Sequence, residues 1–315
     1  MIVHIFQATK SFGGVSYNTN KIDRNKGELM RVANFGPLQG LGKLRPQDYV
    51  NYLEMITGLN KNVKKPQFHA VISAKGKAYN QHSLTVIAEA WLKEMGYGKQ
   101  PYLIVFHKDT DNNHVHLVST RIDRDGAKIS SGFEKRRAIK NLNKVLGFDY
   151  GFGYKFSTRA QFFLLLEKAG YLGTDPMEAL LQQKINNYKA DKERAAEIKA
   201  ILQQTKHAGN YEDILKHQYK IDLIFHASEG KEPYGYTIID HEHKMVFKGS
   251  EVYPLKELRQ VSGNAMQVDQ AELVSDKNIS FPAYIQSISI SDDVDDQQIH
   301  GMRRRRQKKA RTNTR

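Results

Sequence analysis

Apolar residues recur with a helical period in the N-terminal half of the chain. The clearest case is a segment ending before Gly96 and Gly98, whose apolar positions follow i, i+3, i+4, i+7 spacing: Leu84, Ile87, Ala88, Trp91, Leu92 and Met95. An earlier helix is predicted from Pro46, which suits a first helical turn, to about Thr57, with Gly58 as its stop.

Between these helices lie short runs with the apolar character of strands. The predicted strands are residues 2–8, 67–73, 102–107 and 114–122. The last two are joined by the polar loop KDTDNN, which predicts a hairpin, whereas residues 13–26 show only a Gly-Gly turn and a polar, basic stretch. The order strand, helix, strand, helix, strand, strand predicts an α+β fold with a central, mostly antiparallel sheet flanked by helices.

After Asp125–Gly126 the pattern changes to helices followed by short strands. Helices are predicted over residues 133–147, 158–170 and 176–205, short strands within 220–248, and a closing helix over 254–261. We therefore expect a core at 1–150, a helical and short-strand extension at 151–262, and a linker with a disordered basic tail at 263–315.

Charge adds the first indication of a partner. The 315 residues carry a net charge of +14, with eight basic and no acidic residues in 303–315 but seven acidic residues and one lysine in 263–302. Residues 1–262 therefore keep +12, and a basic folded surface is typical of proteins that bind a polyanion such as nucleic acid.

Composition excludes several classes. The chain has no cysteine, which excludes disulfides, thiolate metal sites and a cysteine nucleophile and fits a reducing cytoplasm. No run approaches the ~18 apolar residues of a membrane span, and the N-terminus lacks a secretory signal pattern. The sequence thus predicts a cytoplasmic protein without a membrane span.

The segment FHKDTDNNHVHLVSTRID contains the densest chemistry. His114 and His116 alternate on one predicted strand, so their side chains share a face, and the hairpin brings His107 beside them. Three neutral imidazoles on one face predict a facial metal site with open positions. Asp109, in the connecting loop, is placed to accept an imidazole N–H and fix the tautomer of a ligand.

Three other histidines and one tyrosine are further candidates for metal binding or catalysis. His241 and His243 form a second HxH pair, but it lacks an upstream third ligand. His69 could line the same sheet face, where a packed or supporting role is favoured over a fourth ligand. Tyr17, surrounded by small, polar and basic residues, is a candidate nucleophile for phosphate chemistry, with metal-activated water as the alternative.

The combination of these motifs resembles the relaxase and mobilization nuclease family of HUH endonucleases. The resemblance covers roughly residues 1–150 and rests on H-x-D-x-x-x-x-H-x-H (His107, Asp109, His114, His116), followed by a strand ending in Arg121-Ile-Asp123. The early Tyr17 and the segment FHAVIS at 68–73 match further family positions. The resemblance implies a ferredoxin-like palm and initiation of conjugative transfer by site- and strand-specific nicking and rejoining of DNA.

The resemblance also implies roles for individual residues and partners. Tyr17 would attack the scissile phosphate and become linked to the 5′ phosphate, while a divalent cation on the three histidines, Mg²⁺ or Mn²⁺, neutralises charge. Three imidazoles also accept Ni²⁺ or Zn²⁺. The DNA-contacting candidates of the basic cleft are Asn18, Lys21, Arg24, Lys26 and Arg121. Expected partners are single-stranded DNA with a hairpin at a transfer origin, accessory relaxosome proteins and a coupling protein, whereas the oligomeric state stays open.

Three alternatives stay open on the sequence. A rolling-circle replication initiator would use a downstream tyrosine, for which Tyr150, Tyr154, Tyr171 and Tyr188 are candidates. A non-catalytic module that binds single-stranded nucleic acid would carry the histidines as packing residues, and a metallohydrolase would form no protein–DNA adduct. The basic tail is interpreted as a DNA-binding arm or, alternatively, as an export signal.

Overall fold

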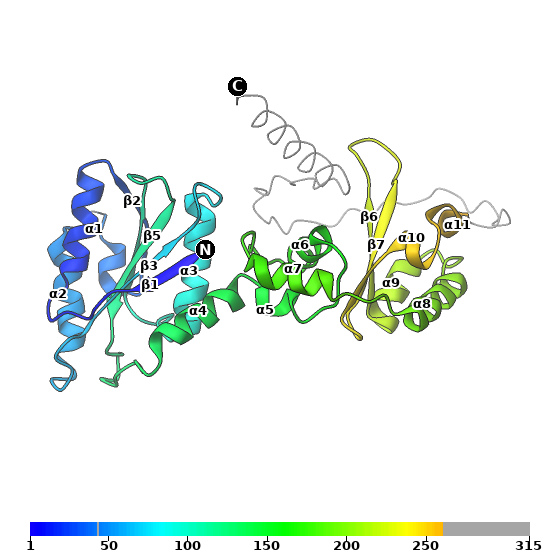
Figure 1. Ribbon diagram of the computed structural model, residues 1–315. Coiled ribbons are helices and arrows are strands. Elements are labelled where there is room, and N and C mark those ends of the chain that lie inside the picture. The colour runs from blue at the N-terminus through cyan, green and yellow to red at the C-terminus, as the bar shows by residue number, and fades with distance from the viewer. Residues whose placement is uncertain (43, 261–315) are drawn as a thin grey trace, which may run out of the picture. The chain divides into compact units, whose positions relative to one another are not determined.

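A computed structural model describes residues 1–42 and 44–260, which form two compact units (Figure 1). Within the described residues, the first unit comprises Met1–Lys189 and Lys244–Val246, and the second comprises Ala190–His243 and Phe247–Gln260. The predicted core boundary at residue 150 thus lies inside the first unit, because helices on both sides of it pack against one another. The predicted linker and basic tail at 263–315 lie outside the described residues.

An antiparallel sheet of five strands forms the centre of the first unit. Its strands run in the order β1-β3-β5-β4-β2, and each neighbouring pair is antiparallel. The strands are β1 (Ile2–Ile5), β2 (Gly27–Ala33), β3 (Gln67–Ser73), β4 (Tyr102–His107) and β5 (His114–Thr120). The predicted α+β class and the hairpin of the last two strands are confirmed.

Helices cover both faces of this sheet (Figure 1). One face is covered by α1 (Gly13–Asp23) and α2 (Pro46–Thr57), and the other by α3 (Gln81–Met95) and α4 (Glu134–Val145). The 3-10 helix η1 (Gly36–Gly40) follows β2. The structure confirms the predicted helices at α2 and α3, and Gly96 ends α3 in the left-handed conformation with φ +92°.

No sequence pattern predicted α1 or β2. The buried face of α1 consists of Gly14, Val15, Asn18 and Thr19, so no apolar period exists for a pattern to detect. Tertiary packing supplies the stabilisation instead. A Cβ at Gly14 would lie 2.9 Å from Gln67 Oε1 and 3.1 Å from His69 Nδ1, so glycine allows α1 to lie close against β3.

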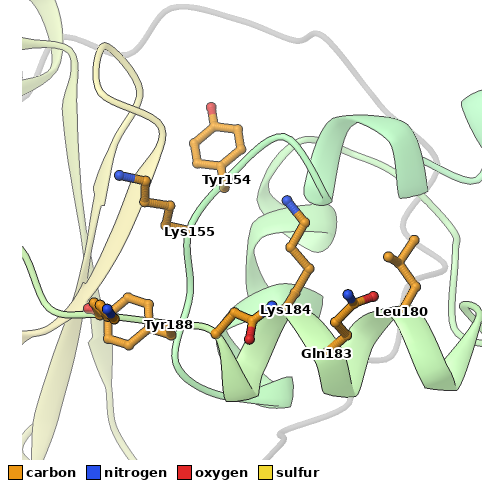
Figure 2. A pocket seen from close by; sticks show the side chains of 8 residues that line it. Tyr154, Lys155, Leu180, Gln183, Lys184 and Tyr188 are labelled. Atoms are coloured by element: carbon orange, nitrogen blue, oxygen red, sulfur yellow. The ribbon is translucent and has the colours of Figure 1, made fainter.

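Three further helices complete the first unit. They are α5 (Phe148–Gly151), α6 (Arg159–Lys168) and α7 (Glu178–Asn186). The loop before α6, together with α7 and the residues that follow it, lines a cavity of about 510 Å³ (Figure 2). The prediction of one helix over 176–205 is wrong, because the chain leaves the helix after Asn186 and Asp191 caps a new one by accepting from the Arg194 amide.

The remaining described elements are helices and a three-stranded sheet, β6-β7-β8, and they form the C-terminal part of the described chain. They are α8 (Lys192–Thr205), α9 (Tyr211–Tyr219), β6 (Ile221–His226), β7 (Gly235–Asp240), β8 (Met245–Lys248), α10 (Gly249–Val252) and α11 (Leu255–Arg259). The short strands predicted within 220–248 are confirmed, whereas α9 was not predicted. None of the helices in the described part of the chain has the length and apolar character needed to cross a bilayer.

Candidate metal centre and its tyrosine

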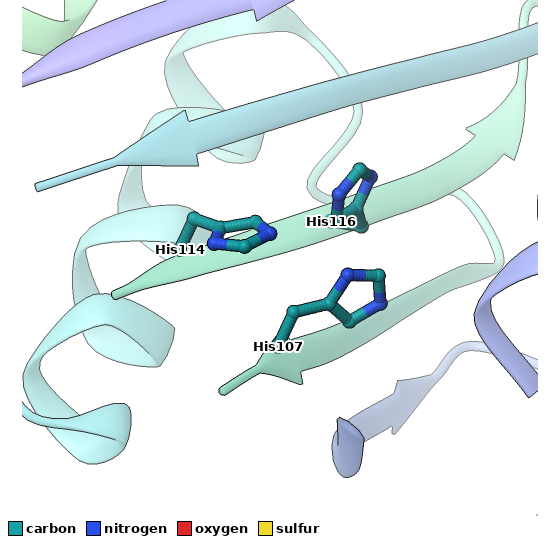
Figure 3. Close-up of side chains that lie close together, drawn as sticks. All are labelled: His107, His114 and His116. Carbon is teal, nitrogen blue, oxygen red and sulfur yellow. The ribbon is translucent and has the colours of Figure 1, made fainter. Parts of the chain in front are cut away.

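Three imidazoles converge on the face of the sheet that α1 covers. His107 at the end of β4 pairs directly with His114 at the start of β5, and His116 follows two residues later on the same face (Figure 3). One candidate ligand atom from each residue lies within 4.8 Å of the others. Within residues 1–42 and 44–260, this is the only cluster of three or more histidine or carboxylate side chains with metal-binding geometry.

Hydrogen bonds orient two of these rings. His114 Nδ1 lies 2.9 Å from the carbonyl oxygen of Asn112, and His116 Nδ1 lies 3.0 Å from His69 Nε2. When Nδ1 of each ring donates, the Nε2 lone pair is left for a metal ion. His107 also has a nitrogen that could bind a metal ion, because its Nε2 is buried without a hydrogen-bond partner.

Burial keeps the inner rings neutral. Desolvation, followed by the charge of His114, lowers the pKa of His107 to about 4, and desolvation together with His107 and His69 lowers that of His116 to about 2. Unfolded histidines take up protons near pH ~6.5, so acid below that value favours the unfolded chain, and the folded rings stay neutral at neutral pH. Neutral imidazole is the form that binds a metal ion.

The donor set fits a divalent cation. Three imidazole nitrogens, one of them orphaned in the interior, provide part of a coordination sphere and leave other positions for water or substrate oxygens.

Tyr17 lies against this cluster. It is on α1 with 48% of its surface exposed, and its ring centroid is 5.9 Å from that of His107 and 5.7 Å from that of His116. Helix α1, which the sequence did not predict, therefore places the candidate nucleophile Tyr17 beside the histidines and leaves it partly exposed to solvent.

Lys21 and Asp109 form an ion pair beside Tyr17. Lys21 lies one helical turn after Tyr17, with its Nζ 5.8 Å from the ring centroid, and donates to the Asp109 carboxylate. This hydrogen bond raises the pKa of Lys21 and lowers that of Asp109, so both groups are charged at neutral pH. The predicted hydrogen bond from a ligand imidazole to Asp109 is not among the contacts of the described residues. Asn112 and His69 orient His114 and His116 instead.

The DNA-contacting candidates on and after α1 differ in their accessibility. Arg24 and Lys26 are exposed, as a phosphate contact requires. Asn18 is 1% exposed and donates from Nδ2 to the Gly14 carbonyl 2.7 Å away, because it lies on the face of α1 that packs on the sheet. Its predicted role as a DNA contact is therefore corrected to a packing role.

The predicted role of Arg121 as a DNA contact is also corrected. Its guanidinium is buried and forks onto Glu134, with distances of 2.6 and 2.9 Å, and lies 5.3 Å from the Phe68 ring centroid. A bidentate pair held in the interior has no accessible donor face for a phosphate backbone. Arg121 instead links β5 to the start of α4.

This assignment predicts a large effect of Arg121→Met on stability. Glu134 would keep a buried carboxylate without its partner, and we expect the free energy of unfolding in urea to fall by about 3–5 kcal/mol. The double variant Arg121→Met/Glu134→Gln should recover part of that loss, and Lys140→Met, at an exposed position on α4, is the matched control. Equal stability of Arg121→Met and the parent would contradict a structural role.

Two supporting residues complete the site. His69 contacts His116 as described above, which confirms the expected supporting role. Burial lowers the pKa of His69 to about 4. Phe6, which the sequence did not single out, stacks on His116 with centroids 5.9 Å apart and packs against the tilted ring of His69 with centroids 4.5 Å apart. No pattern would have revealed Phe6, because it lies just beyond β1 and meets these rings only through the fold.

The second histidine pair has another function. His241 lies 3.1 Å from Asp222, and His243 lies 3.2 Å from Asp240, in the turn between β7 and β8. These contacts tie the turn to the neighbouring strands, and neither histidine belongs to a metal-binding cluster of the described residues.

The chain is similar to several known proteins. Residues 17–152 match the family model described as "Relaxase: MobA/VirD2-like, nuclease domain". Protein TraI of Escherichia coli is 28% identical over 85 residues, which cover 27% of this chain and 11% of TraI. A solved structure described as "Molecular Basis of Vancomycin Resistance Transfer in Staphylococcus aureus" is 15% identical, covers 54% of this chain and 95% of that chain, and has a TM-score of 0.32.

Proposed function

We propose that this chain, whose residues 17–152 match the model of a MobA/VirD2-like relaxase nuclease domain, nicks and rejoins one strand of DNA at a transfer origin. The observation that supports this most directly is the position of Tyr17 against His107 and His116. A nucleophile and a metal site this close can act on one phosphate, which is the requirement for metal-assisted transesterification.

Tyr17 is the proposed nucleophile. Its phenolic oxygen forms a bond to the scissile phosphorus while the bond from phosphorus to the 3′ oxygen breaks. The phenol proton is lost to solvent, and the departing 3′ oxygen takes up a proton. The product is a 5′-phosphotyrosyl linkage and a free 3′ hydroxyl, so the strand can be rejoined by the reverse reaction without an external energy source.

The histidines would hold the divalent cation that assists this reaction. When bound, the cation neutralises negative charge on the non-bridging phosphate oxygens. Asn112 and His69 keep His114 and His116 oriented, and burial keeps His107 and His116 neutral. We propose Mg²⁺ or Mn²⁺ as the physiological ion.

Lys21 and Asp109 are proposed as positioning residues. Their ion pair links α1, which carries Tyr17, to the loop that joins the two strands of the metal hairpin. A second link lies one turn further on, where the Lys108 amide donates to the Lys26 carbonyl and its Nζ to Asn25. Together these contacts hold the tyrosine helix in register with the histidines.

Lys21→Met should lower the rate of adduct formation by about tenfold, because misplaced reacting groups lose rate even when the site is intact. Mn²⁺ affinity, measured by calorimetry, should not change. The exchanged pair Lys21→Asp/Asp109→Lys should recover part of the rate if the link positions α1. An unchanged rate in Lys21→Met would contradict this role.

Covalent capture tests the proposed function. The full chain is incubated with Mn²⁺ and a pool of random single-stranded oligonucleotides, and complexes that resist SDS are isolated. We expect a peptide carrying a nucleotide on Tyr17 and enrichment of one DNA sequence among the captured strands. Strand cleavage without any adduct would favour the metallohydrolase instead.

The arrangement of the downstream tyrosines disfavours a rolling-circle initiator. Tyr150 contacts Tyr154 and Tyr171, with ring centroids 5.2 and 5.4 Å apart, whereas Tyr17 has ring contacts with His107 and His116. We propose single-stranded DNA with a hairpin at the origin as the substrate, Arg24 and Lys26 as backbone contacts, and cytoplasmic nicking with accessory and coupling proteins as partners.

A further inference from the structure

A basic and aromatic pocket lies outside the segment that matches the nuclease family. It has a volume of about 510 Å³, within the range of small-molecule sites, and its lining residues fall between 154 and 189 of the first unit (Figure 2). They are Tyr154, Lys155, Leu180, Gln183, Lys184, Asn187, Tyr188 and Lys189. Three of the eight are lysines and none is acidic, so the pocket favours an anion.

The uncharged lining residues narrow the class of anion. Tyr188 is half-buried and its side chain lines the pocket. Tyr154 is buried, and its hydroxyl lies 3.1 Å from that of Tyr150. Gln183 and Asn187 are exposed carboxamides spaced i, i+4 at the end of α7, so both lie on one face. Carboxamides can donate and accept along the edge of a base, and a tyrosine ring can stack on its face.

The lysines are arranged around these groups. Lys155 and Lys189 are exposed, whereas Lys184 donates from Nζ to the Phe152 carbonyl 2.9 Å away and so ties α7 to the loop before α6. The ammonium groups of Lys155 and Lys189 are thus accessible to phosphates, whereas Lys184 holds one side of the pocket in place. An acidic peptide would use the ammonium groups but would leave the stacking surface and the carboxamides unused.

We propose that this pocket binds one nucleotide of single-stranded DNA, with the base on Tyr188 and the flanking phosphates on Lys155 and Lys189. The assignment of DNA as the polymer rests on the proposed function. The pocket provides a second contact for the strand on the unit that carries Tyr17. It thereby extends recognition beyond the nuclease domain.

The test measures binding without cleavage. The full chain carrying Tyr17→Phe is titrated, without metal, into labelled oligothymidylate and into an abasic strand of equal length. Tyr188→Leu should weaken binding to oligothymidylate about tenfold and leave abasic binding unchanged, while Tyr188→Phe, which keeps the ring, should bind like the parent. An effect of equal size on both strands, or none on either, would overturn the proposal.

The lysines are tested through salt dependence. Lys155→Gln/Lys189→Gln should reduce the slope of log affinity against log salt by about 1.4, the value for two phosphates of a single strand. The matched control, Lys140→Gln/Lys168→Gln, alters two exposed lysines outside the pocket and should not change the slope. Poly-L-glutamate binding that responds to Tyr188→Leu as oligothymidylate does would assign the pocket to acidic polymers and overturn the proposal.

The two proposals fail separately. A chain that forms the Tyr17 adduct but shows no dependence on Tyr188 would overturn the pocket and leave the proposed function intact. A chain that forms no adduct but binds oligothymidylate through Tyr188 would overturn the proposed function and keep a nucleotide-binding pocket.

Discussion

Tyr17→Phe is expected to abolish the covalent adduct and to lower strand cleavage by at least about 10³-fold. The variant loses only the hydroxyl, and the ring can still pack against His107 and His116. DNA binding and Mn²⁺ affinity should therefore match those of the parent. The measurement is cleavage of a labelled single strand captured by the parent, with products resolved on an SDS gel and a sequencing gel.

Tyr150→Phe is the matched control, because it removes a hydroxyl from a tyrosine that contacts other tyrosines instead of the histidines. It should cleave at the parental rate. Loss of the adduct in Tyr150→Phe together with its retention in Tyr17→Phe would transfer the nucleophile to the downstream cluster and support a replication initiator.

His116→Ala is expected to lower cleavage by about 10²–10³-fold, since it removes a ligand of the ion that offsets charge on the phosphate. His116 lies centrally, in contact with His107, His114 and His69. Its loss should weaken Mn²⁺ binding in calorimetry. Chelation of the parent by EDTA should give the same loss of cleavage, and added Mn²⁺ should restore activity only in the parent.

Two histidine variants provide the comparison. His82→Ala alters an exposed residue on the opposite side of the sheet and should change neither metal affinity nor cleavage. His69→Phe removes the partner of His116 Nδ1 and should cost about 10–100-fold in metal affinity, less than the loss of the ligand itself. Full cleavage by His116→Ala in EDTA would contradict a role for a histidine-bound ion in the reaction.

Sequence patterns predicted correctly those features that depend on the spacing of nearby residues. The helix at 81–95 shows a full apolar stripe with a glycine stop, and the spacing of His107, His114 and His116 places three rings on one face once a hairpin is assumed. Both follow from periods of 3.6 and 2 residues, which depend on sequence alone.

Tertiary structure decided the features that depend on residues distant in sequence. The helix at 13–23 has no apolar stripe, since its buried face is made of glycine, valine, asparagine and threonine packed on strands more than 50 residues away. For the same reason the sequence could not show that Lys21 would reach Asp109, or that Arg121 would turn inward to Glu134.

The amino-acid sequence by itself thus indicated the candidate metal ligands and the candidate tyrosine, because short-range spacing and side-chain chemistry carry that information. Only the folded chain decided that Tyr17 lies beside the histidines, which side chains orient them, and which basic residues remain accessible to DNA. Those outcomes depend on how α1 packs on the sheet, and packing between distant segments leaves no period in the sequence.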